Sequence, residues 1–471
     1  IGCRNNEEQA ISREFSVSGI KQVKVDVNEL IIGMHVSGLD RPWSQTPFPL
    51  QGFFIRQPDE IDQLRLYCKY VLIDVQRGKQ PVAVKHSTIE KKGGGAAADA
   101  AETRQRQQIT AAPLKLRHNF YSDPVALKKE NVAAEKLHGD IKSNIAEIMS
   151  GINQGGVIEV KKTAQLASQV VDSVVRNPDA FSWLSRIRDK DEFTYGHIVR
   201  SAVWAGVFGR HIGLDKKEMN ALVSACLLKD VGKVKLPEQL LVIPEEDRTL
   251  EQQEEYKKFI EYSVEILRAT PGVPAEIIHI VRNHCERFDG SGFPQGLIGD
   301  KIPFLAKVAG IVTVYDAVTN PRNSKYPLAP SKAMAKLYDM RNIEFQEELV
   351  VQFIQALGIY PTGTLIELNT GEVAVVVEQT FARRLKPKVA IVVDKDKNRL
   401  KEPAILDLFE DFSEKLRKAE KRGQPTSSIK AIEIVKDVEP GSFDIDIAEV
   451  RDSYLKETWN WRTMLGNITG R

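Results

Sequence analysis

The chain has few cysteines and no excess of charge of either sign. Its 471 residues include four cysteines. These are widely spaced without a CxxC pair, which excludes a disulfide framework and favours free thiols in a reducing compartment. The 66 basic and 64 acidic residues nearly cancel, so composition gives no argument for a nucleic-acid or membrane-surface partner. These absences favour a cytoplasmic globular protein.

Long apolar runs and several nucleotide and hydrolase motifs are absent too. No stretch approaches the roughly 18 apolar residues that a membrane span requires. The chain begins at Ile1 rather than Met, and the residues present show no signal-peptide pattern. Neither a P-loop or Rossmann glycine loop nor a GxSxG elbow occurs, so none of those sites is expected.

Periodicity and composition predict a mainly α protein: a helical bundle with a small α/β N-terminal domain and a small C-terminal β module. Alternation in QVKVDV predicts a strand, and apolar residues at spacings of three and four predict helices. A hairpin across Asn369–Gly371 begins the β module. The expected segments are a flexible N-terminus (1–18), the α/β domain (19–85), a low-complexity linker (86–117), the helical domain (118–356), the β module (357–398) and a charged helix with a tail (399–471).

A carboxylate extends the apolar face of one predicted helix, KEMNALVSACLLKD. Asp230 continues the stripe that Met219, Val223 and Cys226 form. A carboxylate there is expected to be buried, and a buried carboxylate needs a cation or several donors. A helix cap or a core salt bridge explains Asp230 as well as a metal site does.

Two histidines lie on apolar helical faces elsewhere in the helical domain. His284 follows Ile277, Ile280 and Val281, and His197 begins another helix. A single histidine in such a place is more often a core residue than a ligand. Histidine and aspartate on neighbouring helices together are more informative, because helical bundles hold metals in this way.

The sequence around these residues resembles a known family, the HD-GYP domains of bacterial cyclic di-GMP signalling. The strings that carry the resemblance are LLKDVGKVKLPEQLL, FIEYSVEILRATPG, HCERFDGSGFPQGLIGDKIP and IVTVYDAVTNPRNSKYP, with Phe293 in place of the usual Tyr. Residues 19–85 resemble the small domain that often precedes HD-GYP, and 350–377 resemble its C-terminal extension. The resemblance implies an HD-type helical bundle and metal-dependent hydrolysis of cyclic di-GMP.

The resemblance also implies where the metal ligands would lie, and most of those positions are changed. His197, Asp230 and His284 keep the expected residue type. The other positions carry residues of another type: Lys229, Phe259, Cys285 and Thr313. Cys285 could bind as a thiolate, which favours a softer metal such as zinc. We therefore expect no metal, or at most one divalent ion (Fe, Mn or Zn).

Lys229 suggests what replaces the metal. Its ammonium would repel a divalent cation, and it could instead supply the positive charge that a buried Asp230 needs. Adjacent helical residues diverge by about 100°, so whether the side chain reaches Asp230 is open from sequence alone.

Binding could survive the loss of metal. The resemblance places catalytic roles at Asp230 and Lys233 and a phosphate contact at Lys233. Arg287 and Arg322 are further cations near the expected pocket, and Arg–phosphate pairing needs no metal. The remaining candidate ligand-binding residues form the signature loop: Asp289, Gly290, Gly292, Phe293 and Pro294. A simpler explanation of Gly290 and Gly292 is a backbone with positive φ.

Three functions remain open. The first is a degenerate HD-GYP domain that acts as a cyclic di-GMP sensor or as an interaction scaffold. The second is an active cyclic di-GMP phosphodiesterase with a reduced metal site, and the third is a structural protein that binds no nucleotide. The resemblance implies diguanylate cyclases or other signalling proteins as partners of the Gly-Phe-Pro loop, and homodimerisation.

Overall fold

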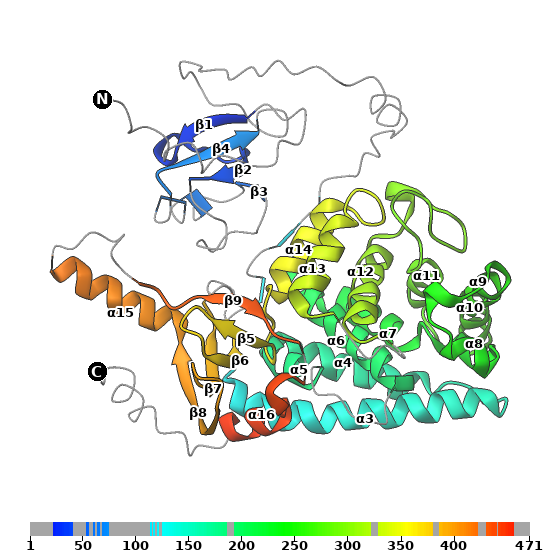
Figure 1. Cartoon of the computed structure of the whole chain (residues 1–471). Coiled ribbons are helices and arrows are strands. Elements are labelled where there is room, and N and C mark those ends of the chain that lie inside the picture. The colour runs from blue at the N-terminus through cyan, green and yellow to red at the C-terminus, as the bar shows by residue number, and fades with distance from the viewer. Residues whose placement is uncertain are drawn as a thin grey trace. The chain divides into compact units, whose positions relative to one another are not determined.

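The computed structural model describes most of the chain as two compact units, residues 1–100 and 101–471. It describes residues 22–40, 53–55, 60–61, 64–65, 68–74, 114, 116–117, 120–121, 125–185, 193–321, 328–379, 386–422, 430–439 and 441–455 (Figure 1). Residues 1–18, nearly all of the expected linker and Arg322 lie outside these ranges.

The first unit is built on an antiparallel sheet. Its strands are β1 (Gln22–Asp26), β2 (His35–Leu39), β3 (Phe53–Phe54) and β4 (Tyr70–Asp74), in the order β1-β4-β2-β3. One apolar core contains the buried side chains of Val25, Val36, Val71 and Ile73, as the alternating sequence predicts. A short 3-10 helix, η1 (Val27–Glu29), follows β1. Residues 60–61 and 64–65 are helical.

The second unit is dominated by helices. These are α3 (Leu127–Asn153), α4 (Val160–Arg176), α5 (Pro178–Leu184), α6 (Phe193–Ile212), α7 (Lys216–Leu228), η3 (Val231–Lys235), α8 (Glu238–Val242), η4 (Glu245–Asp247), α9 (Leu250–Lys257), α10 (Phe259–Ala269), α11 (Ala275–Asn283), η5 (Gly299–Lys301), α12 (Phe304–Thr319), α13 (Pro330–Asp339) and α14 (Glu347–Leu357). No helix among the described residues is long and apolar enough to cross a membrane. The mainly α fold class is confirmed.

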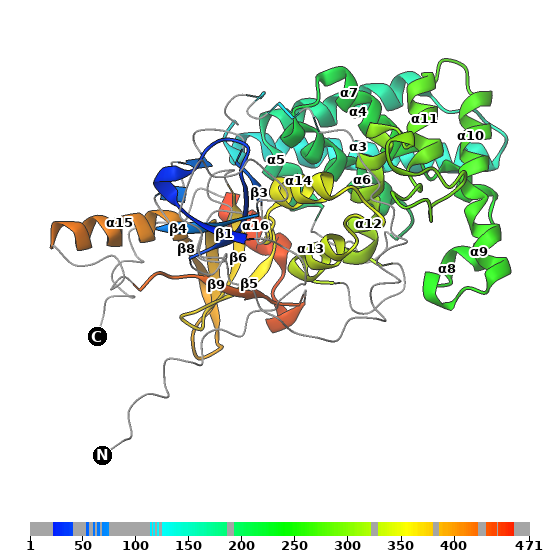
Figure 2. The same ribbon diagram turned by 90° about the horizontal axis from the view of Figure 1, so that it is seen from above.

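Helices α6 and α7 form the centre of the bundle. Both contact α4 and α12, α7 also packs on α11, and α6 on α14 (Figure 2). The close approach depends on small residues in α6, since a side chain at Gly209 would press on Leu214 and Met219. Asp215 starts α7 with a capping box closed by Glu218, which satisfies free N–H groups of the first turn.

An ion pair between a buried carboxylate and a partly exposed arginine ties α3 to α4. Glu130 in α3 accepts hydrogen bonds from Arg176 Nε at 2.7 Å and from Ser173 Oγ at 2.6 Å. Burial alone would raise the pKa of Glu130, but Arg176 and Ser173 outweigh it and lower that pKa. The carboxylate therefore stays charged in the folded protein.

Glu130→Gln is expected to lower the free energy of unfolding by about 1–2 kcal/mol at pH 7. Because the folded-state pKa is lowered, the stabilisation is complete above the ordinary glutamate pKa of about 4.3 and disappears as the pH falls through the folded value. Urea unfolding at pH 7 and at low pH measures this. A difference that grows on acidification would contradict the ion pair.

The C-terminal sheet is larger than the sequence predicted. Strands β5 (Leu365–Leu368), β6 (Val373–Glu378), β7 (Lys388–Val393), β8 (Arg399–Asp407) and β9 (Ile434–Asp437) pair in the order β8-β7-β6-β5-β9. The hairpin across Asn369–Gly371 is confirmed. The expected end of the module at residue 398 was wrong, because β8 and β9 belong to the same sheet. Neither strand has a fully buried residue, and both mix polar with apolar residues, so they lack the alternation of a half-buried strand.

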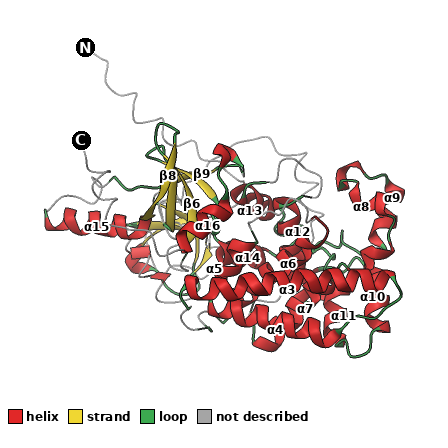
Figure 3. Cartoon of the chain, turned by 90° about the horizontal axis from the view of Figure 1, so that it is seen from below, coloured by secondary structure: helices red, strands yellow, loops and turns green. Residues whose placement is uncertain are grey.

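The segment 399–471, expected as a charged helix and tail, therefore contributes both strands and helices. Helix α15 (Leu408–Lys421) starts after β8, and η8 (Ser442–Asp444) and α16 (Ile447–Leu455) follow β9. Helix α5 joins the sheet to the bundle: Trp183 Nε1 donates to Val377 O at 3.1 Å, and Asp179 accepts from Gln379 N at 3.1 Å. The sheet lies on one side of the helices, against α16 and α13 (Figure 3).

Candidate functional site

The candidate site forms where α6, α7, α12 and η3 meet. Helix α7 ends at Leu228, and the chain passes through Lys229 and Asp230 into η3. A Cβ at Gly232 would lie 2.2 Å from Phe259 O, so only glycine lets η3 approach α10 this closely. Ser263 of α10 fixes the turn, because its Oγ donates to Lys229 O at 3.0 Å and accepts from Gly232 N at 2.9 Å.

Lys229 is a buried cation at the centre of the site. Its side chain is 1% exposed, and its Nζ lies 2.5 Å from Asp230 Oδ2 and 3.0 Å from His197 Nε2. Lys233 Nζ lies 2.7 Å from the other carboxylate oxygen, Asp230 Oδ1. Burial alone would raise the pKa of Asp230, but Lys229, Lys233 and His197 hold that pKa well below its usual range. Lys229 therefore reaches Asp230 and supplies the positive charge expected there. The sequence alone had left open whether the side chain could reach it.

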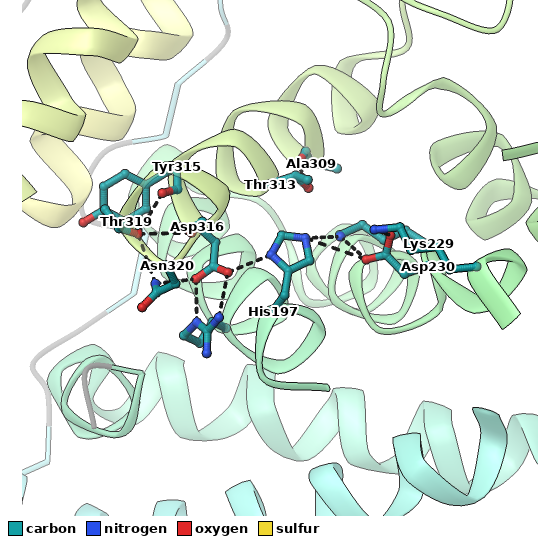
Figure 4. Close-up of polar contacts among 11 residues, drawn as sticks. His197, Lys229, Asp230, Ala309, Thr313, Tyr315, Asp316, Thr319 and Asn320 are labelled. Carbon is teal, nitrogen blue, oxygen red and sulfur yellow. Dashed lines mark hydrogen bonds and ion pairs between the residues drawn. The ribbon is translucent and has the colours of Figure 1, made fainter. Parts of the chain in front are cut away.

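His197 connects this pair to a second carboxylate (Figure 4). Its Nδ1 lies 2.7 Å from Asp316 Oδ2 in α12, and its Nε2 faces the ammonium of Lys229. Burial and the nearby Lys229 charge lower the pKa of His197, against the opposing effect of Asp316. A neutral imidazole that donates from Nδ1 and accepts at Nε2 satisfies both contacts.

Asp316 and Arg200 are site residues that the sequence analysis missed. Asp316 is fully buried and accepts from Arg200 Nε at 2.7 Å and Nη2 at 3.2 Å, and from Asn320 Nδ2 at 3.1 Å. The available signal was a carboxylate inside the apolar helix IVTVYDAVT. The family position assigned to Thr313 lies one turn earlier, and Thr313 Oγ1 donates to the backbone O of Ala309 at 2.7 Å.

Asp316→Asn is expected to cost about 2–3 kcal/mol of stability at neutral pH, since charged hydrogen bonds to Arg200 and His197 are lost. Burial would raise the pKa of Asp316, but Arg200 and His197 lower it to about 2. Its contribution is therefore complete above the ordinary aspartate pKa of about 3.9 and is lost as the pH falls towards about 2. Urea titrations at several pH values measure this, and a loss independent of pH would refute the assignment.

His284 and Cys285 lie side by side at the end of α11. His284 Nδ1 donates to Val281 O at 2.8 Å, and its Nε2 faces Cys285 Sγ at 3.4 Å. Burial, with the Lys229 charge, lowers the pKa of His284 to about 3. Burial raises the pKa of Cys285 to about 11, so the thiol is protonated near neutral pH. The ring of Phe259 lies 6.2 Å from that of His284.

These donors do not fit a metal centre of two or three ions. The Lys229 ammonium lies against His197 Nε2 and Asp230 Oδ2, the atoms that would coordinate, and Lys233 takes the other oxygen of Asp230. Phe259 offers no donor atom. Among the described residues, no group of three or more His, Cys, Asp or Glu side chains is arranged to hold a metal ion.

The signature loop is held by a buried carboxylate at its base. Glu286 accepts from Gln295 N at 2.8 Å and from Leu297 N at 2.9 Å. Asp289 accepts from Ser291 N at 2.9 Å and Gly290 has a φ of 87°. Asp289 and Gly290 therefore form a local turn, and Glu286 holds the end of the loop.

The explanation expected for Gly292 was wrong. Its φ is not positive; instead a Cβ there would lie 2.2 Å from Arg287 N, so close backbone approach excludes a side chain. Phe293, joined to Pro294 by a cis peptide bond, lies with its ring 6.3 Å from that of Phe259. The loop thus presents Phe293 towards the site.

Only part of the expected cation set faces the site. Lys233 lies at the site but is paired with Asp230. Arg287 pairs with Glu344 at 3.2 Å and lies over the ring of Phe345. The pairing of Arg287 could not be found from the sequence, because Glu344 lies 57 residues away. The pairing of Lys233 could have been found, because Asp230 lies one helical turn before it.

Comparison with known families accounts for most of the chain. Residues 184–349 match the family described as HD domain, and 22–163 match a domain of unknown function (DUF3391). Residues 365–414 match a KOW domain associated with the HD domain, in agreement with a C-terminal sheet that extends beyond residue 398.

Curated relatives are named as cyclic-dinucleotide phosphodiesterases. A cyclic di-GMP phosphodiesterase of Pseudomonas aeruginosa is 27% identical over 368 residues, which cover 78% of this chain and 84% of the relative. A cyclic di-GMP phosphodiesterase response regulator of Xanthomonas campestris is 29% identical over 37% of this chain, and the match spans 47% of its length. A 3'3'-cGAMP-specific phosphodiesterase of Vibrio cholerae is 30% identical over 36% of this chain and 33% of its own.

A solved HDG"Y"P protein from Bdellovibrio bacteriovorus aligns with 71% of this chain and 98% of its own, with a TM-score of 0.42 and 16% identity. With the family matches and the curated relatives, the sequence motifs place the chain among the HD-domain proteins of the HD-GYP type, with a DUF3391 region before the HD domain and a KOW domain after it.

Proposed function

We propose that this chain is a non-hydrolytic HD-GYP protein that binds cyclic di-GMP and signals through binding. The observation that carries the proposal is the Lys229 ammonium, which contacts both His197 Nε2 and Asp230 Oδ2. The curated relatives named as cyclic di-GMP phosphodiesterases supply the ligand class.

The absence of hydrolysis follows from the charges around Lys229. A divalent ion at His197 and Asp230 would meet an ammonium at hydrogen-bond distance, and Coulomb repulsion at this range is large in a buried site. Metal-assisted hydrolysis needs a bound ion that lowers the pKa of water. Asp230 and Asp316 are both charge-paired, so neither is available as a general base in place of the metal.

Retention of binding follows from the excess of positive charge. Among the described residues, the cations Arg200, Lys229 and Lys233 face two carboxylates, Asp230 and Asp316, and the imidazole is neutral. Lys233 is the outermost, with 21% of its side chain exposed. A partly exposed cation at the edge of a low-dielectric site favours a phosphate group without a metal.

A second candidate function is a protein-interaction scaffold, whose partners would be diguanylate cyclases or other signalling proteins. Two exposed apolar side chains lie beside the signature loop: Ile298 is 46% exposed and Ile343 is 39% exposed. Asp289 N donates to Ile343 O at 2.9 Å and Asp289 bridges to Ile298. Exposed apolar groups that lie close together are typical of a protein contact.

The test is a calorimetric titration of the full chain with cyclic di-GMP, in Mn²⁺ and in chelator, with chromatography of the nucleotide products. We expect saturable binding that chelator does not abolish, and no linear dinucleotide or mononucleotide product. Metal-dependent product formation would overturn the proposal in favour of a reduced hydrolase. Absence of binding in both buffers would leave the scaffold as the function.

A further inference from the structure

The segment between η3 and α10 brings a second cation against an aromatic ring that Lys233 also approaches. Arg248 follows η4, and its guanidinium carbon lies 3.7 Å from the centre of the Tyr256 ring in α9. Lys233 Nζ lies 5.6 Å from the centre of the same ring and 4.9 Å from that of Phe259. Helices α8, α9 and α10 lie together at the end of the unit away from the sheet (Figures 1 and 2).

Arg248 is poorly satisfied within the described part of the chain. Its Nε is buried without a hydrogen-bond partner there, and its Nη1 reaches only Gln253 Oε1, at 3.5 Å. No described carboxylate lies within ion-pair distance, although three exposed acidic residues precede it (Glu245, Glu246 and Asp247). A buried donor without an acceptor is uncommon in folded proteins, so Arg248 keeps hydrogen-bonding capacity that the described residues do not use.

Neighbouring cations differ from Arg248 in this respect. Lys257 pairs with Glu254 at 2.5 Å, and Lys258 pairs with Glu255 at 2.5 Å. Their positive charges are therefore balanced locally. The charge of Arg248 is held in place by the aromatic ring of Tyr256 and stays available to an anion.

The aromatic rings around these cations form a wall beside the site. The rings of Tyr256 and Phe259 lie 5.4 Å apart, and those of Phe259 and Phe293 lie 6.3 Å apart. Tyr256 and Phe293 are half-buried and Phe259 is buried. Apolar walls lower the local dielectric constant and strengthen a cation–phosphate contact.

We propose that Arg248, stacked on Tyr256, and Lys233 form a phosphate subsite that receives a phosphodiester of the bound cyclic dinucleotide. The planar guanidinium presents two parallel N–H donors, which match two phosphate oxygens, while Lys233 adds a point charge. This subsite deepens the function proposed above and rests on it for the identity of the ligand. None of the motifs that identify the family includes Arg248 or Tyr256.

The experiment compares cyclic di-GMP affinity, in chelator, for the wild-type chain, Arg248→Met, Arg248→Lys and a control, Arg268→Met, which changes an exposed arginine near the end of α10. We expect Arg248→Met to weaken binding about 10- to 100-fold, as loss of charge-assisted hydrogen bonds does. Arg248→Lys should recover part of the affinity, because it keeps the charge but loses the planar fork. Arg268→Met should bind like the wild type, and circular dichroism checks the fold of each variant.

Wild-type affinity in Arg248→Met would overturn the subsite and leave the proposed function intact. If the wild-type chain does not bind cyclic di-GMP, the proposed function fails, and sodium pyrophosphate then serves as the probe of the subsite. Pyrophosphate binding that Arg248→Met weakens would uphold the subsite. Pyrophosphate binding that is absent, or independent of Arg248, would overturn it.

Discussion

Lys229→Met is expected to lower the free energy of unfolding of the helical unit by about 3–5 kcal/mol. The substitution keeps an unbranched chain of similar length but removes the ammonium that contacts Asp230 Oδ2 and His197 Nε2. Removing one partner of a buried ion pair is costly, because the remaining charge stays desolvated without its partner. Lys233 still contacts Asp230 Oδ1, so the loss should fall short of full unfolding.

Urea unfolding followed by circular dichroism and by tryptophan fluorescence measures this effect; the buried Trp183 and Trp204 contribute to the fluorescence. Lys258→Met is the matched control, since its side chain is 49% exposed and a surface ion pair such as that with Glu255 contributes little to stability. An unchanged unfolding midpoint for Lys229→Met would refute the role of the ammonium.

A double variant separates loss of charge pairing from loss of packing. Lys229→Met combined with Asp230→Asn removes both members of the pair, so the uncompensated carboxylate disappears. We expect the double variant to be more stable than the sum of the two single losses predicts. Simple additivity would mean that the two side chains do not stabilise each other.

The second large effect is on metal binding and hydrolysis. We expect it in a variant that carries the family's metal-ligand residues at the four changed positions. The variant carries Lys229→His, Phe259→His, Cys285→His and Thr313→Asp, the four changed positions. It removes the buried ammonium and adds donors around His197, Asp230 and His284. We expect it to bind about two divalent ions per chain, as a two-metal site does, and to hydrolyse cyclic di-GMP at least about 10³-fold faster than the wild type.

Elemental analysis of protein loaded with Mn²⁺ or Fe²⁺ and chromatography of the products measure both quantities. The control adds Asp230→Asn to the four changes, which removes the retained carboxylate and should abolish metal binding. A wild-type chain that already binds metal and hydrolyses cyclic di-GMP would contradict the idea that Lys229 blocks the site. A restored variant that folds but binds no metal would show that further residues prevent coordination.

The residues that could be identified from sequence are those with a strong local pattern. Asp230 at the end of an apolar stripe is buried, as predicted, because helical periodicity is a local property. The hairpin across Asn369–Gly371 follows from adjacent strands and a short turn. Loss of the family ligand at Phe259 is visible at once, since a phenyl ring has no donor atom.

The chain's own sequence thus determined the mainly α class, the position of the HD motifs and the substitutions that make a metal centre unfavourable. Only the tertiary structure decided how the charges are arranged. It brought Asp316 of α12 onto His197 and Arg200 of α6 and set the ammonium of Lys229 against His197 Nε2. Such contacts depend on how helices far apart in sequence pack, and residue spacing along one helix carries no information about them.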